Sequence, residues 1–256
     1  MTNHVDICTC DIQSDAKVTG DAKFASEPST GQIRSVFEIH KSSPICRRIL
    51  EDKRLVECAM QILDSSVYVH QSRINFQLPF VGTGFWWHSD FETWHAEDGM
   101  PAPRALSMVV LMNDNFGQNG ALMVSPGSHK TFIQCAGETP ERNWETSLKE
   151  KQKYGTPDLQ SLSELIEIHG LDYCEGKRGD VLMFDSNLMH GSHNNISPWA
   201  RSNLFAVFNS AENLLTPQPY AAPMQRPEHI ATRDPEWMQG ITPKEGSVAN
   251  ERFEIE

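Results

Sequence analysis

The sequence lacks the features of membrane, secreted and nucleic-acid-binding proteins. No apolar run approaches the roughly 18 residues of a membrane-spanning helix, and the N-terminus has no basic and apolar regions of a secretory signal. Basic residues are few, with 22 Lys and Arg against 34 Asp and Glu, and the net charge is −12. This charge disfavours nucleic acid and anionic membranes as partners. The sequence therefore predicts a cytoplasmic protein that binds neither.

The six cysteines do not form a disulfide framework. Their spacing is irregular, and the pair Cys8 and Cys10 has no second Cys or His pair nearby. Reduced thiols are the favoured interpretation, ahead of disulfides or a soft-metal site at this pair.

The chain divides into a leader and one domain. Residues 1–31 are polar and lack hydrophobic periodicity, which predicts a poorly ordered leader. Residues 32–256 are long enough for a single domain with its own core. The Pro-rich tail beyond Leu215 is expected to wrap the surface.

Two segments carry helical signals. Ser43 suits an N-cap and Pro44 the first helical position, which predicts a helix from there to about Leu63. Its expected buried stripe is Ile45, Ile49, Val56, Met60 and Leu63. Apolar residues recur at roughly helical spacing over residues 159–168, before Gly170.

Strand patterns dominate the remainder. From Val67 to Gln77 the residues alternate, so that Val67, Val69 and Gln71 are expected on one face with Arg73, Asn75 and Gln77. Further candidate strands are Phe85–Ser89, Arg104–Met112, Ala121–Val124, Asp180–Phe184 and Asn203–Asn209. Since crossover helices are mostly absent between them, we expect a mainly β fold with flanking helices, an antiparallel sandwich or jelly roll.

A His-x-Asp motif and a distant histidine suggest a metal site. His88 and Asp90 are two residues apart on a predicted strand and can face one ion, and His190 follows about a hundred residues later. Two imidazoles and a carboxylate on one face suit non-haem Fe(II), with the other face open to a co-substrate and O₂. The alternative is that these histidines bind nothing.

Arg201 is a candidate anion ligand. It lies eleven residues after His190 and opens a predicted strand. A guanidinium can bind a carboxylate through two parallel hydrogen bonds. This suits a dicarboxylate whose 2-oxo acid end chelates iron while its other end meets Arg201. Ser192 could donate a further hydrogen bond to the same carboxylate. The alternative is an ordinary surface salt bridge.

The run from Phe85 to Pro101, with Trp87-His88-Ser89-Asp90 at its centre, resembles the signature of bacterial ectoine hydroxylases. That family belongs to the phytanoyl-CoA-dioxygenase-like branch of the Fe(II)/2-oxoglutarate oxygenases. The similarity covers roughly residues 30–233. Matching segments also occur at residues 69–75, 126–129, 136–140, 189–192 and 226–228.

The resemblance implies a double-stranded β-helix (a cupin-like jelly roll) that uses Fe(II), 2-oxoglutarate and O₂. It implies hydroxylation of ectoine to 5-hydroxyectoine with release of succinate and CO₂. The iron ligands would be His88, Asp90 and His190. Positions around 2-oxoglutarate would be Asn75, Gln77, Phe85, Ser192 and Arg201. Positions lining the ectoine pocket would be Gln71, Trp94, Ser107, Phe184, Asn203 and Phe205.

The chemistry of several pocket residues agrees with these roles. Trp94 and Phe205 would offer aromatic faces to a delocalised amidinium cation. Gln71 and Asn203 would supply neutral hydrogen bonds that fix the orientation of the substrate. For the aromatic residues, plain core packing remains the alternative.

The sequence departs from the family at two places. Family members carry a lysine where Gln77 stands, and its loss leaves Arg201 to hold the co-substrate charge largely alone. Family members also have several dozen more residues before the region matching Phe37, so we expect an N-terminal helix and an edge strand to be missing. A homodimer is a family-level expectation.

Two other functions stay open. Free L-proline 4-hydroxylases share much of the Glu97-Asp98-Gly99-Met100 region, but they lack the Asn-x-Phe found here at Asn203 and Phe205, which favours ectoine. A jelly roll without catalytic activity, acting as a binding protein, is the second alternative.

Overall fold

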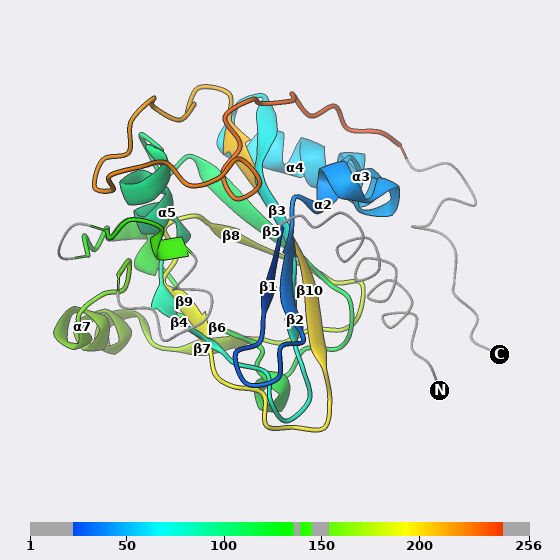
Figure 1. Ribbon diagram of the computed structural model, residues 1–256, viewed down its shortest axis with the longest axis vertical. Helices are drawn as coiled ribbons and strands as arrows, with labels where there is room; N and C mark the ends of the chain where they lie inside the picture. The colour runs from blue at the N-terminus through cyan, green and yellow to red at the C-terminus, as the bar shows by residue number, and fades with distance from the viewer. Residues whose placement is uncertain (1–22, 136–138, 145–153, 243–256) are drawn as a thin grey trace.

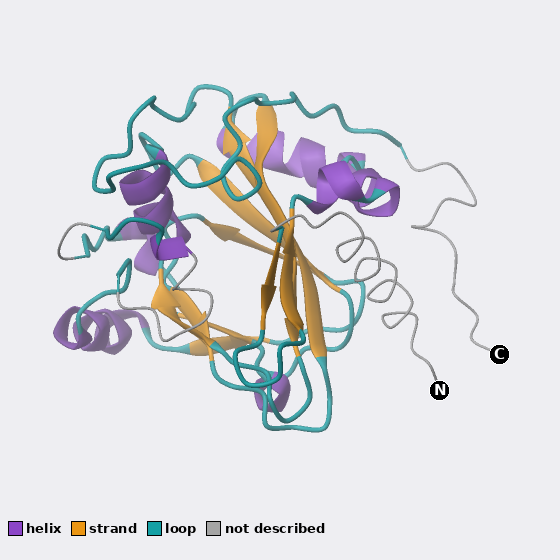
Figure 2. Ribbon diagram, in the orientation of Figure 1, coloured by secondary structure: helices purple, strands orange, loops and turns teal. Residues whose placement is uncertain are grey.

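Two antiparallel β-sheets form the framework of the computed structural model, which describes residues 23–135, 139–144 and 154–242 (Figure 1). The larger sheet has six strands, in the order β1 (Phe24–Ser26), β2 (Ile33–Phe37), β3 (Val67–Gln77), β10 (Arg201–Ser210), β5 (Ala105–Leu111) and β8 (Val181–Asp185). The smaller sheet has four, in the order β4 (Phe85–His88), β9 (His190–Ser192), β6 (Leu122–Val124) and β7 (Asp172–Cys174). The predicted mainly β jelly roll with flanking helices is confirmed (Figure 2).

The centre of the larger sheet is the pairing of β10 with β3 and β5. All ten residues of β10 are buried. One face of these strands packs on helices near the N-terminal end of the described chain, in a core cluster that includes Leu50, Val56, Leu106 and Phe208. A strand that is buried on both sides is held firmly in register, so the opposite face of β3 and β10 gives functional side chains a rigid support.

A bulge alters the predicted alternation along β3. Strict alternation places Val69 and Ile74 on opposite faces, but both pack in the same core cluster. Val207 of β10 pairs with Gln71 of β3, but the next residue, Phe208, pairs with Val69, so β3 has one extra residue at this point. An extra residue in a strand reverses the faces beyond it, so the expectation that Val69 and Gln71 share a face is wrong.

The predicted leader extends too far. Strand β1 lies within residues 1–31 and pairs with β2, with Phe24 opposite Val36 and Ala25 buried. Glu27 N–H donates to Gln32 O at 2.7 Å and closes the turn between them. Three residues are too few to show alternation, so no strand could be predicted there from the sequence. Residues 1–22 lie outside the described part of the chain.

The predicted helix from Pro44 to Leu63 is two helices, α3 (Pro44–Leu50) and α4 (Lys53–Leu63), preceded by α2 (Ile39–Ser42). Ser43 caps α3 as expected and accepts a hydrogen bond from Cys46 N–H at 3.3 Å. The break occurs at Asp52, whose carboxylate caps the next helix by accepting from Arg54 N–H at 2.9 Å. Ile45, expected in the buried stripe, is 51% exposed.

The second predicted helix is confirmed as α7 (Leu159–His169). Asp158 caps its start, and Gly170, at a φ of +77°, follows its end. No helix of the described residues is both long and apolar enough to cross a membrane. Cys58, Cys135 and Cys174 are free thiols, and Cys8 and Cys10 lie outside the described part of the chain.

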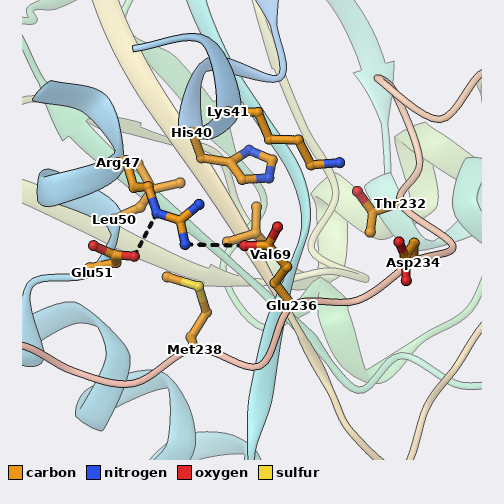
Figure 3. Close-up of a pocket in the computed structure, with 10 residues that line it drawn as sticks. All are labelled: His40, Lys41, Arg47, Leu50, Glu51, Val69, Thr232, Asp234, Glu236 and Met238. Atoms are coloured by element: carbon orange, nitrogen blue, oxygen red, sulfur yellow. Dashed lines mark hydrogen bonds and ion pairs between the residues drawn. The ribbon is translucent and has the colours of Figure 1, made fainter. Parts of the chain in front are cut away.

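Histidine burial predicts a loss of stability in mild acid. His40 lies in the pocket between α2, α3, β3 and the C-terminal segment (Figure 3), where its Nδ1 is 2.6 Å from Ser72 Oγ. Burial, with Lys41 nearby, lowers the pKa of His40 from 6.5 to about 4. The unfolded chain therefore binds a proton in a pH range where the folded protein does not, so stability falls as the pH drops from 6.5 towards 4.

The free energy of unfolding is expected to drop by about 2 kcal/mol between pH 6.5 and 5 through this group. His40→Gln should flatten this part of the profile in urea melts at several pH values. His169→Gln, at the end of α7, is the control. An unchanged slope in His40→Gln would contradict the assignment.

Candidate metal and co-substrate site

The paired strands β4 and β9 bring the three predicted metal ligands together. His88, at the end of β4, stands opposite His190 of β9. The motif predicted that Asp90 lies on the same strand as His88, but Asp90 is the first residue of α5 (Asp90–Thr93). Ser89 caps this helix by accepting a hydrogen bond from Glu92 N–H at 3.2 Å. One ligand atom from each of the three residues lies within 4.8 Å of the others. They can therefore hold one metal ion.

Backbone carbonyls orient both imidazoles. His88 Nδ1 lies 2.6 Å from Trp86 O, and His190 Nδ1 lies 2.9 Å from Leu188 O. A carbonyl only accepts, so each Nδ1 carries the proton, and the lone pair of each Nε2 would be available to a metal ion.

The environment favours the metal-binding forms of His88 and Asp90. Burial, together with the adjacent His190, lowers the pKa of His88 to about 4. Burial alone would raise the pKa of Asp90, but His190 and Arg73 lower it below the usual range. Neutral imidazole and ionised carboxylate ligands suit Fe(II).

Ser107, predicted to line the substrate pocket, supports the metal site. Its hydroxyl donates to Asp90 Oδ2 at 3.1 Å. This leaves Oδ1, which lies 3.9 Å from His88 Nε2, as the oxygen nearer the other ligands. A partner of this kind fixes the orientation of a ligating carboxylate.

Ser107→Ala is expected to weaken Fe(II) binding about tenfold, because the carboxylate of Asp90 loses its donor. Equilibrium dialysis against graded Fe(II) under argon measures the effect. Ser125→Ala is a matched control, since the buried Ser125 hydroxyl has no hydrogen-bond partner in the described structure. Equal affinity in the two variants would show that Ser107 does not support the site.

Arg201 lies at the start of β10 as a buried cation. It is 2% exposed, which contradicts the surface salt bridge weighed above. Its guanidinium donates to Gly120 O, and its Nε has no partner among the described residues. Burial and the nearby Arg34 lower the pKa of Arg201 to about 10. A buried guanidinium with spare donors can bind a carboxylate.

The other predicted co-substrate residues gather around Ser192. Its hydroxyl oxygen accepts hydrogen bonds from Phe85 N–H at 3.2 Å and from Gln77 Nε2 at 3.1 Å. The Oε1 atom of Gln77 is buried without a partner in the described residues. Asn75 lies two residues before Gln77 on β3 and accepts a hydrogen bond from Ser35 Oγ at 2.8 Å.

Four of the predicted substrate residues lie on the inner strands β3, β5 and β10 of the larger sheet, whereas Phe184 lies on the edge strand β8. Phe184 and Phe205 belong to one apolar cluster, and the Phe184 ring is 5.0 Å from that of His190. Asn203 accepts a hydrogen bond from Asn115 Nδ2 at 3.0 Å. Trp94 belongs to a different cluster, where it meets His70 edge-on at 5.1 Å.

The sequence reasoning missed Arg73. Its guanidinium lies 4.5 Å over the ring of Phe205 and donates to Gln71 Oε1, and it is close enough to Asp90 to lower the pKa of that carboxyl. Burial in turn lowers the pKa of Arg73. Its place between Gln71 and Asn75 on an alternating strand was the available signal. This cation lies between the metal ligands and the predicted substrate residues.

Comparisons with known proteins agree with this geometry. The family model described as phytanoyl-CoA dioxygenase (PhyH) matches residues 14–203. An ectoine dioxygenase of Nocardia farcinica is 49% identical over 223 residues, which cover 87% of this chain and 74% of the relative. That of Bordetella bronchiseptica is 55% identical over 208 residues, covering 81% and 67%.

A solved structure shares the fold. EctD from S. alaskensis with 2-oxoglutarate and 5-hydroxyectoine has a TM-score of 0.77 and 42% identity, covering 90% of this chain and 79% of that one. The same enzyme with bound Fe also has a TM-score of 0.77, at 40% identity, with 93% and 79% covered.

Proposed function

Since the chain belongs to the phytanoyl-CoA dioxygenase family, we propose that it is an Fe(II)- and 2-oxoglutarate-dependent dioxygenase that hydroxylates ectoine to 5-hydroxyectoine. The observation that carries this proposal is the cluster of His88, Asp90 and His190 in one fold with the buried Arg201. Its relatives that are named ectoine dioxygenase support the choice of substrate.

The chain supplies a complete set of groups for iron and 2-oxoglutarate. The Nε2 atoms of His88 and His190 and a carboxylate oxygen of Asp90 would hold the metal. Arg201 and Ser192 would bind the distal carboxylate of 2-oxoglutarate, beside Phe85, Asn75 and Gln77. Bound iron would couple oxidative decarboxylation of the co-substrate by O₂, which yields succinate and CO₂, to hydroxylation. The protein would orient one C–H bond of the substrate and exclude water.

The substrate residues suit a zwitterion. Ectoine carries a carboxylate and a delocalised amidinium, and Arg73 is the cation placed to bind the carboxylate. Trp94 and Phe205 would offer aromatic faces to the amidinium. Gln71 and Asn203 would contribute hydrogen bonds from neutral groups, and Phe184 and Ser107 would complete the lining of the ectoine pocket.

Arg73→Gln is expected to raise the KM for ectoine about 30-fold, the loss of one charge-assisted contact. The affinity for 2-oxoglutarate should stay the same, because Arg201 holds that carboxylate. Initial rates at saturating 2-oxoglutarate measure the first quantity, and calorimetry measures the second. A parallel loss of both affinities would mean that Arg73 serves the site as a whole.

A product assay tests the proposed function. The iron-loaded protein is incubated with 2-oxoglutarate, O₂ and either ectoine or L-proline, and the products are identified by mass spectrometry. One added oxygen on ectoine, with an equivalent of succinate, is expected. Hydroxyproline would identify the alternative hydroxylase. An iron-bound, folded protein without any oxygenated product would favour the non-catalytic binding protein.

The same proposal includes a cytoplasmic homodimer in which each chain works as a single catalytic domain. The family resemblance supports the dimer, and the absence of a membrane-crossing helix among the described residues agrees with the location. Multi-angle light scattering of the purified protein is expected to give twice the chain mass of 28.9 kDa. A monomeric mass would contradict the dimer.

A further inference from the structure

A second buried guanidinium lies beside the candidate co-substrate site. Arg34 belongs to β2 and is 3% exposed. Its Nη2 donates to Gly84 O at 2.9 Å, and its Cζ lies 4.2 Å from the centre of the Phe85 ring. Phe85 in turn donates its N–H to Ser192 Oγ. Arg34 therefore packs directly against a residue that contacts the hydroxyl expected to meet the carboxylate.

The charges of Arg34 and Arg201 act on each other. Alongside burial, Arg34 lowers the pKa of Arg201. Burial lowers the pKa of Arg34 itself, and the nearby Glu27 opposes this. Glu27 is held by Thr83 N–H at 3.1 Å. Arg34 and Arg201 are both buried cations, and each positive charge near an anion site favours a bound anion.

Gln77 contributes no charge to this region. Its amide lies at the centre of the site, with Nε2 3.1 Å from Ser192 Oγ and 3.3 Å from His193 O. Because a neutral amide supplies only a dipole, any second positive charge near the bound carboxylate has to come from elsewhere. In the described residues, Arg34 is the cation that acts on Arg201.

We propose that Arg34 is a positioning residue for the co-substrate, which holds Phe85 against Ser192 and adds the second positive charge that the distal carboxylate of 2-oxoglutarate requires beside Arg201. The inference rests on the proposed function. It predicts that charge at Arg34, Glu27 and Gln77 controls the affinity for a dicarboxylate but has little effect on a 2-oxo acid that lacks the distal carboxylate.

Calorimetry on the Mn(II)-loaded protein without O₂ tests this inference, with 2-oxoglutarate and 2-oxobutanoate as probes. Arg34→Gln is expected to weaken 2-oxoglutarate binding about tenfold, the effect of roughly one charge pair near a protein surface. Binding of 2-oxobutanoate should be unchanged. Glu27→Gln should tighten 2-oxoglutarate binding about threefold, because it removes the opposing charge and keeps an acceptor for Thr83 N–H.

A double variant separates charge from packing. Arg34→Gln/Gln77→Lys is expected to recover most of the lost affinity, because the ammonium would stand at Ser192. Arg54→Gln changes the net charge equally at an exposed side chain paired with Asp52 and is the control. If Arg34→Gln does not melt cooperatively, Arg34→Lys and Glu27→Gln carry the test.

Each outcome decides one question. Unchanged 2-oxoglutarate affinity in both Arg34→Gln and Glu27→Gln, with a binding wild type, would overturn the inference and leave the proposed function intact. Equal losses of affinity for 2-oxoglutarate and 2-oxobutanoate in Arg34→Gln, with no recovery of affinity in Arg34→Gln/Gln77→Lys, would also overturn the inference. That result would mean that Arg34 acts through packing and not through its charge. A wild-type protein that binds Mn(II) but neither probe would contradict the proposed function itself.

Discussion

Replacing Asp90 with alanine is expected to abolish turnover. The variant keeps two neutral imidazoles but loses the anionic ligand, which in a 2-His-1-carboxylate site balances part of the charge of Fe(II). The loss also leaves the Ser107 hydroxyl without the acceptor it has at 3.1 Å. We expect activity to fall by at least about 1000-fold, a barrier increase of roughly 4 kcal/mol.

Two measurements separate the causes of this loss. Iron content after gel filtration should fall well below one equivalent, whereas the melting profile should keep a single cooperative transition. His88→Ala and His190→Ala are expected to behave in the same way. The control is Asp114→Ala, which removes a carboxylate that pairs with Lys177 at 3.0 Å on the surface. Full activity of Asp90→Ala under iron-limited conditions would refute the ligand assignment.

The sequence predicted the long elements well, and the three residues of its candidate metal site lie together in the structure. Strand β3 is eleven residues long and β10 is ten, long enough for repeated strand-forming residues to give a clear signal. The His88, Asp90 and His190 set was predicted because a motif fixes residue types and spacing. Its detailed geometry was not, since Ser89 starts a helix directly after His88 and the motif carries no information about that turn.

The missed features depend on distant contacts. Strands β1, β7 and β9 have three residues each, so only their partners define them. The bulge in β3 depends on its pairing with β10. Arg34 was missed because it belongs to β2, a strand that is defined by its pairing with β1 and β3, and nothing local in the sequence marks its relation to Arg201. Local patterns therefore predicted the ligands, whereas the electrostatic surroundings needed the fold.

Arg201→Gln is the second substitution with a very large expected effect. A bidentate contact to a carboxylate comprises two charge-assisted hydrogen bonds of about 2 kcal/mol each. Their loss should weaken 2-oxoglutarate binding by about 1000-fold. The site also loses a cation that is 2% exposed, and a buried carboxylate without its partner bears a desolvation cost. The Arg201→Gln variant should therefore not be saturated by 2-oxoglutarate at the concentrations of the product assay.

Arg201→Lys distinguishes charge from geometry at this position. An ammonium keeps the positive charge but cannot form the two parallel hydrogen bonds of a guanidinium, so its affinity for 2-oxoglutarate should lie between those of the wild type and Arg201→Gln. Calorimetry on the Mn(II)-loaded variants without O₂ gives the three values, and Mn(II) binding itself should be unchanged. Arg104→Gln, which removes an exposed partner of Glu212, is the control. If Arg201→Gln bound 2-oxoglutarate as tightly as the wild type, the anion site would have to be assigned to other cations, and Arg73 and Arg34 would be the candidates nearest to the metal ligands and to Ser192.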